Sequence, residues 1–230
     1  MERIELTDAR KKDYYYVEAM KTLRTNVLFS GKEVKAILLT SCFPNEGKSD
    51  AAMDLAKNLG EVGKRVLLID ADIRKSSLLR RYSINEETKG LSEYLSGLAE
   101  LKQVMYKTNF ENMDIIFSGT SAPNPAELLE TNAFQVLLTE LKKFYNYIIL
   151  DCPPLGTVID AAIVAKQCDG AIFVVEADKV SYRKAQKVQE QLKKTGCRIL
   201  GAVLNKVDIK KDKYYHKYSY YYSDSQKRKA

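Results

Sequence analysis

Short apolar runs recur along this chain of 230 residues and constrain its fold more than any other feature. The six runs are rich in Ile, Val and Leu and span residues 35–41, 65–70, 113–118, 147–151, 170–176 and 199–205. Runs that are apolar throughout predict strands buried on both faces. Between them lie segments with helical spacing, such as residues 134–145 and 181–195. Strands that alternate with helices predict an α/β fold, a parallel sheet sandwiched by helices.

The remaining sequence indicates one cytoplasmic domain. Hydrophobic residues make up 45% of the chain and charged residues 29%, and no apolar run approaches the ~20 residues that a membrane span needs. The charged segment 1–12 lacks the apolar stretch of a signal peptide, which predicts retention in the cytoplasm. Four cysteines stand far apart without metal-site spacing, so we expect reduced thiols and no zinc. Ahead of the first long run, apolar residues at steps of four, three and four predict an amphipathic helix over residues 14–29.

The positive charge of the chain gathers at its C-terminal end. The net charge is +7, of which residues 209–230 contribute +5 through seven Lys or Arg and two Asp. The same segment holds six of the fifteen tyrosines and almost no aliphatic residue. This composition predicts a folded domain over residues 1–208 and a flexible tyrosine-rich tail over residues 209–230.

A phosphate-binding loop is predicted after the first of the six runs. Gly47, Lys48 and Ser49 match the end of a P-loop that leads into a helix. Lys48 would reach the β and γ phosphates, and the Ser49 hydroxyl would ligate Mg²⁺. Because Cys42 stands where the motif has its first glycine, a helix start with a surface lysine stays open as an alternative. In the phosphate reading, backbone N–H groups cradle the phosphates at Asn45, Glu46, Gly47, Lys48, Ser49 and Asp50.

Three acids follow the ends of two predicted strands. Asp70 ends the run at 65–70 and Asp72 lies two residues beyond it, and Asp151 ends the run at 147–151. A single acid at such a place is often a turn residue or a helix cap. Three of them at one sheet edge, beside Lys48, repel one another unless a cation lies among them, and Mg²⁺ with ATP supplies it. The sequence therefore predicts a P-loop NTPase-type domain with an ATP and Mg²⁺ site.

The motifs together resemble those of a known family. Residues 47–49, 67–74 and 148–153 are similar to the Walker A, Walker A′ and Walker B motifs of the bacterial tyrosine kinases, cytoplasmic autokinases of capsule and exopolysaccharide synthesis. Residues 118–134, the LNKVD run at 204–208 and the terminal tyrosine cluster extend the resemblance over nearly the whole chain.

The resemblance implies roles for the site residues. It makes Lys48 the group that stabilises the transferring phosphoryl group and Asp70 the base that accepts the tyrosine proton. Ser49, Asp72 and Asp151 would hold Mg²⁺, with Asp72 also counted as catalytic, and Asn205 would meet the adenine. Asp50 stands where the family usually has a hydroxyl, which predicts weaker nucleotide binding.

The resemblance also implies substrates and partners. The first helix carries the interface motif of a homo-oligomeric ring at Glu18, Lys21 and Arg24, with Lys21 in place of the expected Arg. A transmembrane polysaccharide co-polymerase on a separate chain would activate the kinase and hold it at the inner face of the plasma membrane, and a cognate phosphatase would oppose it. The phosphoacceptors would be Tyr214, Tyr215, Tyr218, Tyr220, Tyr221 and Tyr222.

Three alternatives remain at this stage. A partitioning-type ATPase switch shares the sheet and the motifs, but it needs a signature lysine where this chain has Phe43. A weakly active ATP-binding scaffold stays open because of Asp50. A nucleic-acid arm would also interleave aromatic and basic residues, but a chain with its own phosphoryl-donor site favours tyrosine acceptors, and we expect no nucleic-acid partner. The sequence names neither the polysaccharide nor the tyrosines that are modified.

Overall fold

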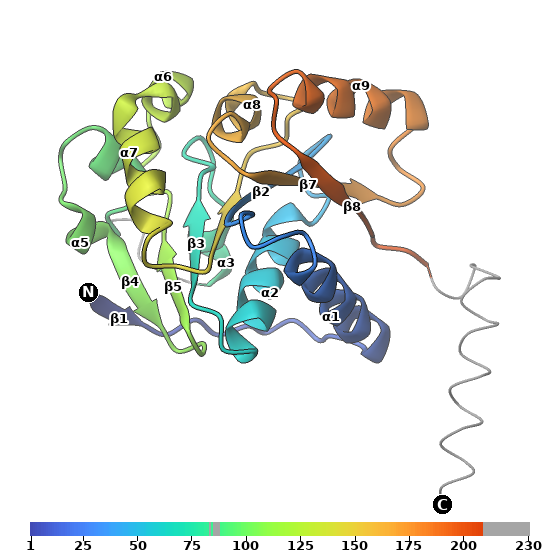
Figure 1. The fold of residues 1–230 in the computed structure, drawn as a ribbon, viewed down its shortest axis with the longest axis horizontal. Coiled ribbons are helices and arrows are strands. Elements are labelled where there is room, and N and C mark those ends of the chain that lie inside the picture. Colours follow the sequence, from blue (N-terminus) through green and yellow to red (C-terminus); the bar gives the residue numbers. More distant parts are fainter. Residues whose placement is uncertain (83, 85–87, 209–230) are drawn as a thin grey trace, which may run out of the picture.

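An eight-stranded sheet forms the centre of the computed structural model, which describes residues 1–82, 84 and 88–208 (Figure 1). Its strand order is β1-β4-β5-β3-β6-β2-β7-β8, and every pair is parallel except β4 with β5. The predicted tail lies outside the described residues. The strands are β1 (Glu2–Ile4), β2 (Ala36–Ser41), β3 (Val66–Asp70), β4 (Met105–Thr108), β5 (Met113–Ile116), β6 (Tyr147–Asp151), β7 (Gly170–Glu176) and β8 (Ile199–Asn205).

The six apolar runs are confirmed as strands, with one correction to their burial. Every residue of β2, β3 and β6 is buried, as continuous hydrophobicity predicts. In contrast, β8 closes one edge of the sheet, and Leu204 in it is 61% exposed. The short strands β1 and β4 were not predicted, because three or four residues with mixed polarity carry too little pattern.

Helices cover both faces of the sheet, as predicted for the sandwich. One face is packed by the group from α4 to α9, and the other by α1, α2 and α3. The two layers are visible above and below the sheet in Figure 1. The helices are α1 (Tyr14–Leu28), α2 (Lys48–Glu61), α3 (Leu78–Arg81), α4 (Leu91–Leu95), α5 (Leu101–Val104), α6 (Pro125–Glu130), α7 (Asn132–Leu141), α8 (Asp160–Ala165) and α9 (Tyr182–Lys193).

The predicted N-terminal helix is confirmed as α1. It begins after Asp13, whose side chain accepts a hydrogen bond from the Tyr16 N–H, as an N-cap does. Met20 and Val27 are buried against α2, so the helix docks on its own domain. Residues 5–13, which we call the N-terminal segment, lead to it from β1 (Figure 1).

None of the helices among the described residues is long and apolar enough to cross a membrane.

Candidate active site

The predicted site residues meet where three neighbouring strands end. Strand β2 lies between β6 and β7, and β3 lies beside β6. Asp70 and Asp151 are register partners at the carboxyl ends of β3 and β6, and β2 leads from the same edge into the P-loop. The carboxyl edge of an open parallel sheet is where ligands bind. The fold therefore delivers the loop and the acids to one place, as the sequence predicted.

The backbone of the P-loop has the curvature of an anion cradle. Gly47 has φ +90° and Asn45 has φ +67°, both in the left-handed region. The Asn205 amide donates to the Glu46 carbonyl at 2.9 Å. A Cβ at position 47 would lie 2.0 Å from the Asn205 Nδ2 and would displace that side chain, and the left-handed φ also favours glycine there. Asn205 thus holds the loop from β8, and its predicted contact with adenine stays a prediction.

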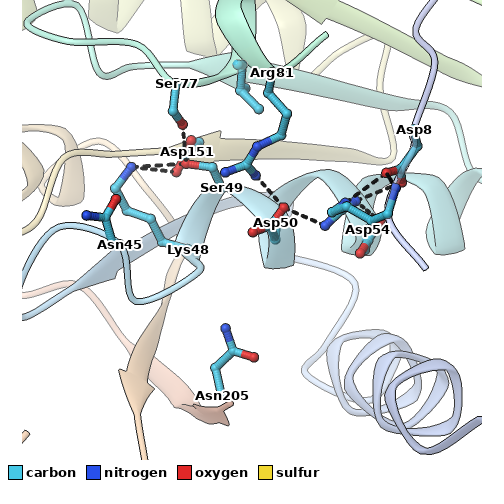
Figure 2. A network of polar contacts seen from close by, with 12 residues as sticks. Asp8, Asn45, Lys48, Ser49, Asp50, Asp54, Ser77, Arg81, Asp151 and Asn205 are labelled. Carbon is cyan, nitrogen blue, oxygen red and sulfur yellow. Dashed lines mark hydrogen bonds and ion pairs between the residues drawn. The ribbon is translucent and has the colours of Figure 1, made fainter. Parts of the chain in front are cut away.

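Lys48 lies among the acids at the start of α2 (Figure 2). Its Nζ is 3.1 Å from Asp151 Oδ1 and 3.7 Å from Asp72 Oδ2. Ser49 Oγ is 3.2 Å from the same nitrogen. All four residues are buried. One ammonium thus joins the three side chains that the sequence assigned to Mg²⁺, namely Ser49, Asp72 and Asp151.

Burial and charge shift the titration of this cluster in a consistent way. Burial raises the pKa of Asp70 to about 8, and the neighbouring Asp151 charge adds to that effect. Burial also raises the pKa of Asp72, although Lys48 opposes the change. Burial lowers the pKa of Lys48, but the charges of Asp151 and Asp72 raise it by more. Keeping these buried carboxylates ionised therefore costs free energy, and a further cation beside them would reduce that cost.

The donor set fits a divalent ion bound with a nucleotide. Among the described residues, Lys48 is the one cation in ion-pair contact with Asp72 or Asp151, and Asp70 has none. Three buried carboxylates thus face a single ammonium, a deficit that a divalent charge would offset. Carboxylate and hydroxyl oxygens are the ligands that Mg²⁺ prefers. In the described part of the chain no three His, Cys, Asp or Glu side chains form a metal site on their own.

Sequence reasoning missed two hydroxyls at this site. Ser76 donates a hydrogen bond to Asp70 Oδ2. Ser77 donates one to Ser49 Oγ at 3.1 Å (Figure 2). Both serines lie between β3 and α3, in the segment that follows the Asp72 motif. A serine next to a basic pair carries no signal of its own, so only the turn after β3 reveals that they face the acids.

Asp50 is paired with two arginines. Its carboxylate accepts a hydrogen bond from Arg10 at 2.5 Å and a second from Arg81. Arg10 reaches it from the N-terminal segment, and Arg81 from α3. The charge of Asp50 is therefore compensated within the protein, a pairing that the sequence did not indicate.

We predict that Asp50→Thr tightens nucleotide binding. The change removes a negative charge beside Ser49 and frees the positive charges of Arg10 and Arg81 for the phosphates. We expect a dissociation constant for ATP lower by about threefold to tenfold, as for a charge effect of about 1 kcal/mol. Titration of the full chain with a fluorescent ATP analogue measures it, with exposed Glu140→Thr as the control. Unchanged or weaker binding by the Asp50 variant would contradict the prediction.

Glu46 carries a pH-dependent cost. Its side chain is buried, Oε2 accepts from the Cys42 N–H at 2.9 Å, and Oε1 has no partner among the described residues. Burial raises the pKa of Glu46 above its ordinary 4.5. The folded protein thus binds this proton more tightly than the unfolded chain, so the Glu46 contribution to stability falls as the pH rises above 4.5.

We therefore expect Glu46→Gln to stabilise the protein at pH 8, by about 1 kcal/mol, because the buried charge is removed. The gain should shrink as the pH falls towards 4.5, because the Glu46 carboxyl is then protonated in the folded state, and it should be small below 4.5, where the carboxyl is protonated in the unfolded chain as well. Urea unfolding at pH 4 and pH 8, without nucleotide, gives the two free energies. A variant whose advantage is the same at both values, or absent at pH 8, would argue against this account.

The predicted interface motif lies on α1, apart from the acids. Lys21 Nζ and Glu18 Oε1 form an ion pair at 2.7 Å on the exposed face. Arg24 Nε is buried and has no hydrogen-bond partner among the described residues. The assignment of Glu18, Lys21 and Arg24 to an interface stays a prediction. The phosphoacceptor tyrosines lie outside the described residues.

Comparison with known proteins agrees with this geometry. The chain matches the AAA domain family over residues 45–201. It is 41% identical over 205 residues to "Tyrosine-protein kinase CpsD" of Streptococcus pneumoniae serotype 4, covering 89% of this chain and 88% of the relative. The kinase domain of the Escherichia coli tyrosine kinase ETK superposes with a TM-score of 0.79 at 31% identity, over 84% of this chain and 76% of that one. The Mg-ADP complex of the septum site-determining protein MinD from Pyrococcus horikoshii gives 0.65 at 28%, over 76% and 71%.

The fold and the loop at Gly47 define a P-loop nucleotide-binding protein of the AAA domain type. The relatives narrow this class. Identity above 30% over most of both chains shows that this chain belongs to the bacterial protein-tyrosine kinase family. The resemblance found in the sequence is thereby confirmed, and the activity is that of a protein-tyrosine kinase.

Proposed function

We propose that the chain uses ATP and Mg²⁺ to phosphorylate tyrosines of its own C-terminal tail, and that this reaction regulates capsule or exopolysaccharide synthesis. The observation that carries the proposal is the position of the Lys48 ammonium, 3.1 Å from Asp151 and 3.7 Å from Asp72 at the start of the P-loop helix. Such a preorganised charge at a phosphate site is what phosphoryl transfer requires.

The residues divide the work of the reaction. Bound Mg-ATP supplies the phosphoryl group and the positive charge that the acids lack. The loop backbone from Asn45 to Gly47 would cradle the phosphates, and Lys48 would turn to the oxygens on which charge develops. Ser49, Asp72 and Asp151 would hold the metal. Because phosphoryl transfer depends mainly on position and charge, this set is sufficient without a separate kinase fold.

Asp70 is proposed as the proton acceptor. Its raised pKa, about 8, suits a group that takes a proton from a tyrosine hydroxyl near neutral pH. Asp70 itself is fully buried, and Ser76 donates to its Oδ2 from a more exposed position. An incoming tyrosine would therefore meet the Ser76 hydroxyl first, and the proton would pass to Asp70 Oδ2 through it.

The partitioning-type ATPase is not favoured as the alternative. ETK matches more of this chain, at a higher TM-score, than MinD does. Phe43 also occupies the place of the signature lysine that the ATPase switches need. A tyrosine-rich tail has no part in that scheme, whereas it is the natural acceptor for a tyrosine kinase.

The partners extend the same proposal. A transmembrane polysaccharide co-polymerase would activate the kinase and keep it at the inner face of the plasma membrane. Copies of the chain would form a ring through Glu18, Lys21 and Arg24 on α1, so that one tail reaches the site of the next copy. A phosphatase would reset the tail. The exposed Lys21–Glu18 pair supports this role for α1 only weakly, since such pairs are common on solvated helices.

The test is self-phosphorylation of the full chain. We expect incubation with Mg-ATP to add one or more phosphates, detected by intact mass and a phosphotyrosine antibody. A variant with Phe at all six tail positions should lose at least about 90% of the signal, since the tail holds six closely spaced acceptors. Replacing Tyr94 and Tyr182 by Phe in the domain is the matched control and should leave it. Undiminished phosphorylation of the tail variant would overturn the proposed substrate.

A further inference from the structure

A cavity of about 390 Å³ opens beside the reacting centre. Asp72 and Ser76 line it, and the same residues belong to the acid cluster and to the hydrogen bond on Asp70. A group bound in the cavity would therefore lie next to the tyrosine that reacts. The volume is near the lower end of the ~300–1,000 Å³ typical of small-ligand sites.

The rim of the cavity is cationic. Arg74, Lys75 and Arg80 line it, and all three are exposed. Arg74 is held by Asp160 through two hydrogen bonds, of 2.6 and 2.9 Å. Lys75 and Arg80 form no ion pair with any side chain in the described part of the chain. Within the described residues, two positive charges without an ion-pair partner thus line a cavity in which Asp72 is the one acid, and Asp72 is already paired with Lys48.

Another part of the cavity lining is a loop of small polar residues that hydrogen bonds hold in place. Residues 118–121 form it, and Glu93 of α4 fixes them by accepting from the N–H and the hydroxyl of Thr120. Burial raises the pKa of Glu93, but hydrogen bonds from Thr120 and Gly90 lower it by more, so the carboxylate stays charged. Gly119 has φ +79°, and a Cβ there would lie 2.0 Å from Glu93 Oε2. The wall is therefore built before any ligand arrives.

We propose that this cavity binds a phosphotyrosine of the C-terminal tail, with Lys75 and Arg80 as its phosphate ligands and Arg74 at its edge. The inference rests on the proposed function, since that reaction supplies the phosphotyrosine. A phosphorylated residue held here keeps the next tyrosine of the tail beside Asp70 and Lys48. The tail tyrosines stand one to three residues apart, so successive acceptors fall within ~10 Å in an extended chain. The cavity thus makes each phosphorylation favour another.

Charge decides that the ligand is the phosphorylated side chain. The unmodified tail carries +5 and is repelled by a cationic rim. Each phosphate adds about −1.5 to −2 and provides acceptor oxygens that lysine and arginine bind with charge-assisted hydrogen bonds. Affinity should therefore rise with modification, in contrast to an ordinary acceptor site, which releases its product.

The test measures peptide binding to the full chain, dephosphorylated and free of nucleotide. The probes are fluorescent peptides of residues 212–224, either phosphorylated at Tyr218 or unmodified, and a phosphorylated peptide of scrambled order. We expect the phosphorylated tail peptide to bind at least about tenfold more tightly than the unmodified one, as for one charge-assisted contact. The Lys75→Ala/Arg80→Ala double variant should lose that preference. Arg183→Ala/Lys187→Ala, which removes two exposed cations from α9, is the control and should keep it.

Each outcome decides the proposal. Equal affinity for the phosphorylated and unmodified tail peptides would overturn it, and so would a double variant that keeps the preference while melting at the wild-type temperature. Equal binding of the scrambled phosphopeptide would overturn the assignment to the tail. Because this assay needs no ATP, a chain that binds the phosphopeptide but never phosphorylates itself refutes the proposed function alone. A chain that phosphorylates itself without the preference refutes the cavity alone.

Discussion

Lys48→Met is expected to lower the rate of tyrosine phosphorylation by about 10³-fold, the scale seen when a preorganised charge is removed from a transition-state site. Lys48 is the only described cation in ion-pair contact with Asp151 and Asp72, at 3.1 and 3.7 Å. Without Lys48 the cluster keeps its three buried carboxylates but has no ammonium to donate hydrogen bonds to the transferring phosphoryl group. The methionine side chain has similar length, so the change removes charge more than volume.

Lys57→Met provides a matched control on the same helix. Lys57 lies further along α2, where its Nζ contacts Asp8 at 3.3 Å and the ring of Phe110 at 4.0 Å to the centroid. Lys57→Met thus removes one positive charge from α2, as Lys48→Met does, but at a position away from the P-loop. The rate is measured as phosphotyrosine formed per minute by the full chain with Mg-ATP. If the Lys48 variant kept a rate within tenfold of the Lys57 variant, the assigned role of the ammonium would be untenable.

The sequence predicted the central strands and the P-loop because their signals are local. Continuous apolar runs become β2, β3 and β6 with boundaries within a residue or two of those predicted. The acids were placed correctly at strand ends because parallel strands present their carboxyl ends at one edge. The spacing of residues in the sequence does not show which strands are neighbours. The sheet topology supplies this, since the register of β3 and β6 places Asp70 opposite Asp151.

The unpredicted features depend on contacts between distant residues. The pairing of Arg10 with Asp50 spans 40 positions, and that of Arg74 with Asp160 spans 86. Neither leaves a pattern in a single sequence. Asp50 accordingly suggested an unbalanced charge beside the phosphates, whereas the fold provides two arginines for it. The cavity beside Asp72 is equally invisible in the sequence, because its walls come from α3 and from residues 118–121.

The N-terminal segment is tied to the P-loop helix by one arginine. Arg10 donates to Asp8 at 2.8 Å, to Asp50 at 2.5 Å and to Asp54 at 2.9 Å. Asp50 follows directly on Ser49, and Asp54 lies one turn further along α2 (Figure 2). The Asp54 side chain is only 1% exposed, so its charge must be satisfied from within. The stability of the segment and the position of the helix are therefore coupled through Arg10.

Arg10→Met should reduce the free energy of unfolding by about 2 kcal/mol. Breaking a buried ion pair by removing one partner costs about 3–5 kcal/mol, and Asp54 here keeps part of its support from Lys12 at 2.6 Å and Tyr16 at 2.6 Å. Urea unfolding at neutral pH measures the loss, and Arg183→Met on the exposed face of α9 is the control, expected within about 0.5 kcal/mol of wild type.

The double variant Arg10→Met/Asp54→Asn separates the pair from packing. Once Asp54 is replaced by neutral Asn, Arg10 has one charge fewer to compensate. The loss in free energy of unfolding caused by Arg10→Met should therefore be at least about 1 kcal/mol smaller in the Asp54→Asn background than in the wild type. Additive losses would mean that Arg10 stabilises the segment only through its aliphatic stem. If the single Arg10→Met variant were as stable as Arg183→Met, the contacts of Arg10 with Asp50 and Asp54 would not stabilise the protein, and the prediction would be wrong. Coupling, in contrast, would establish that Arg10 stabilises the protein by compensating the buried charge of Asp54 on α2.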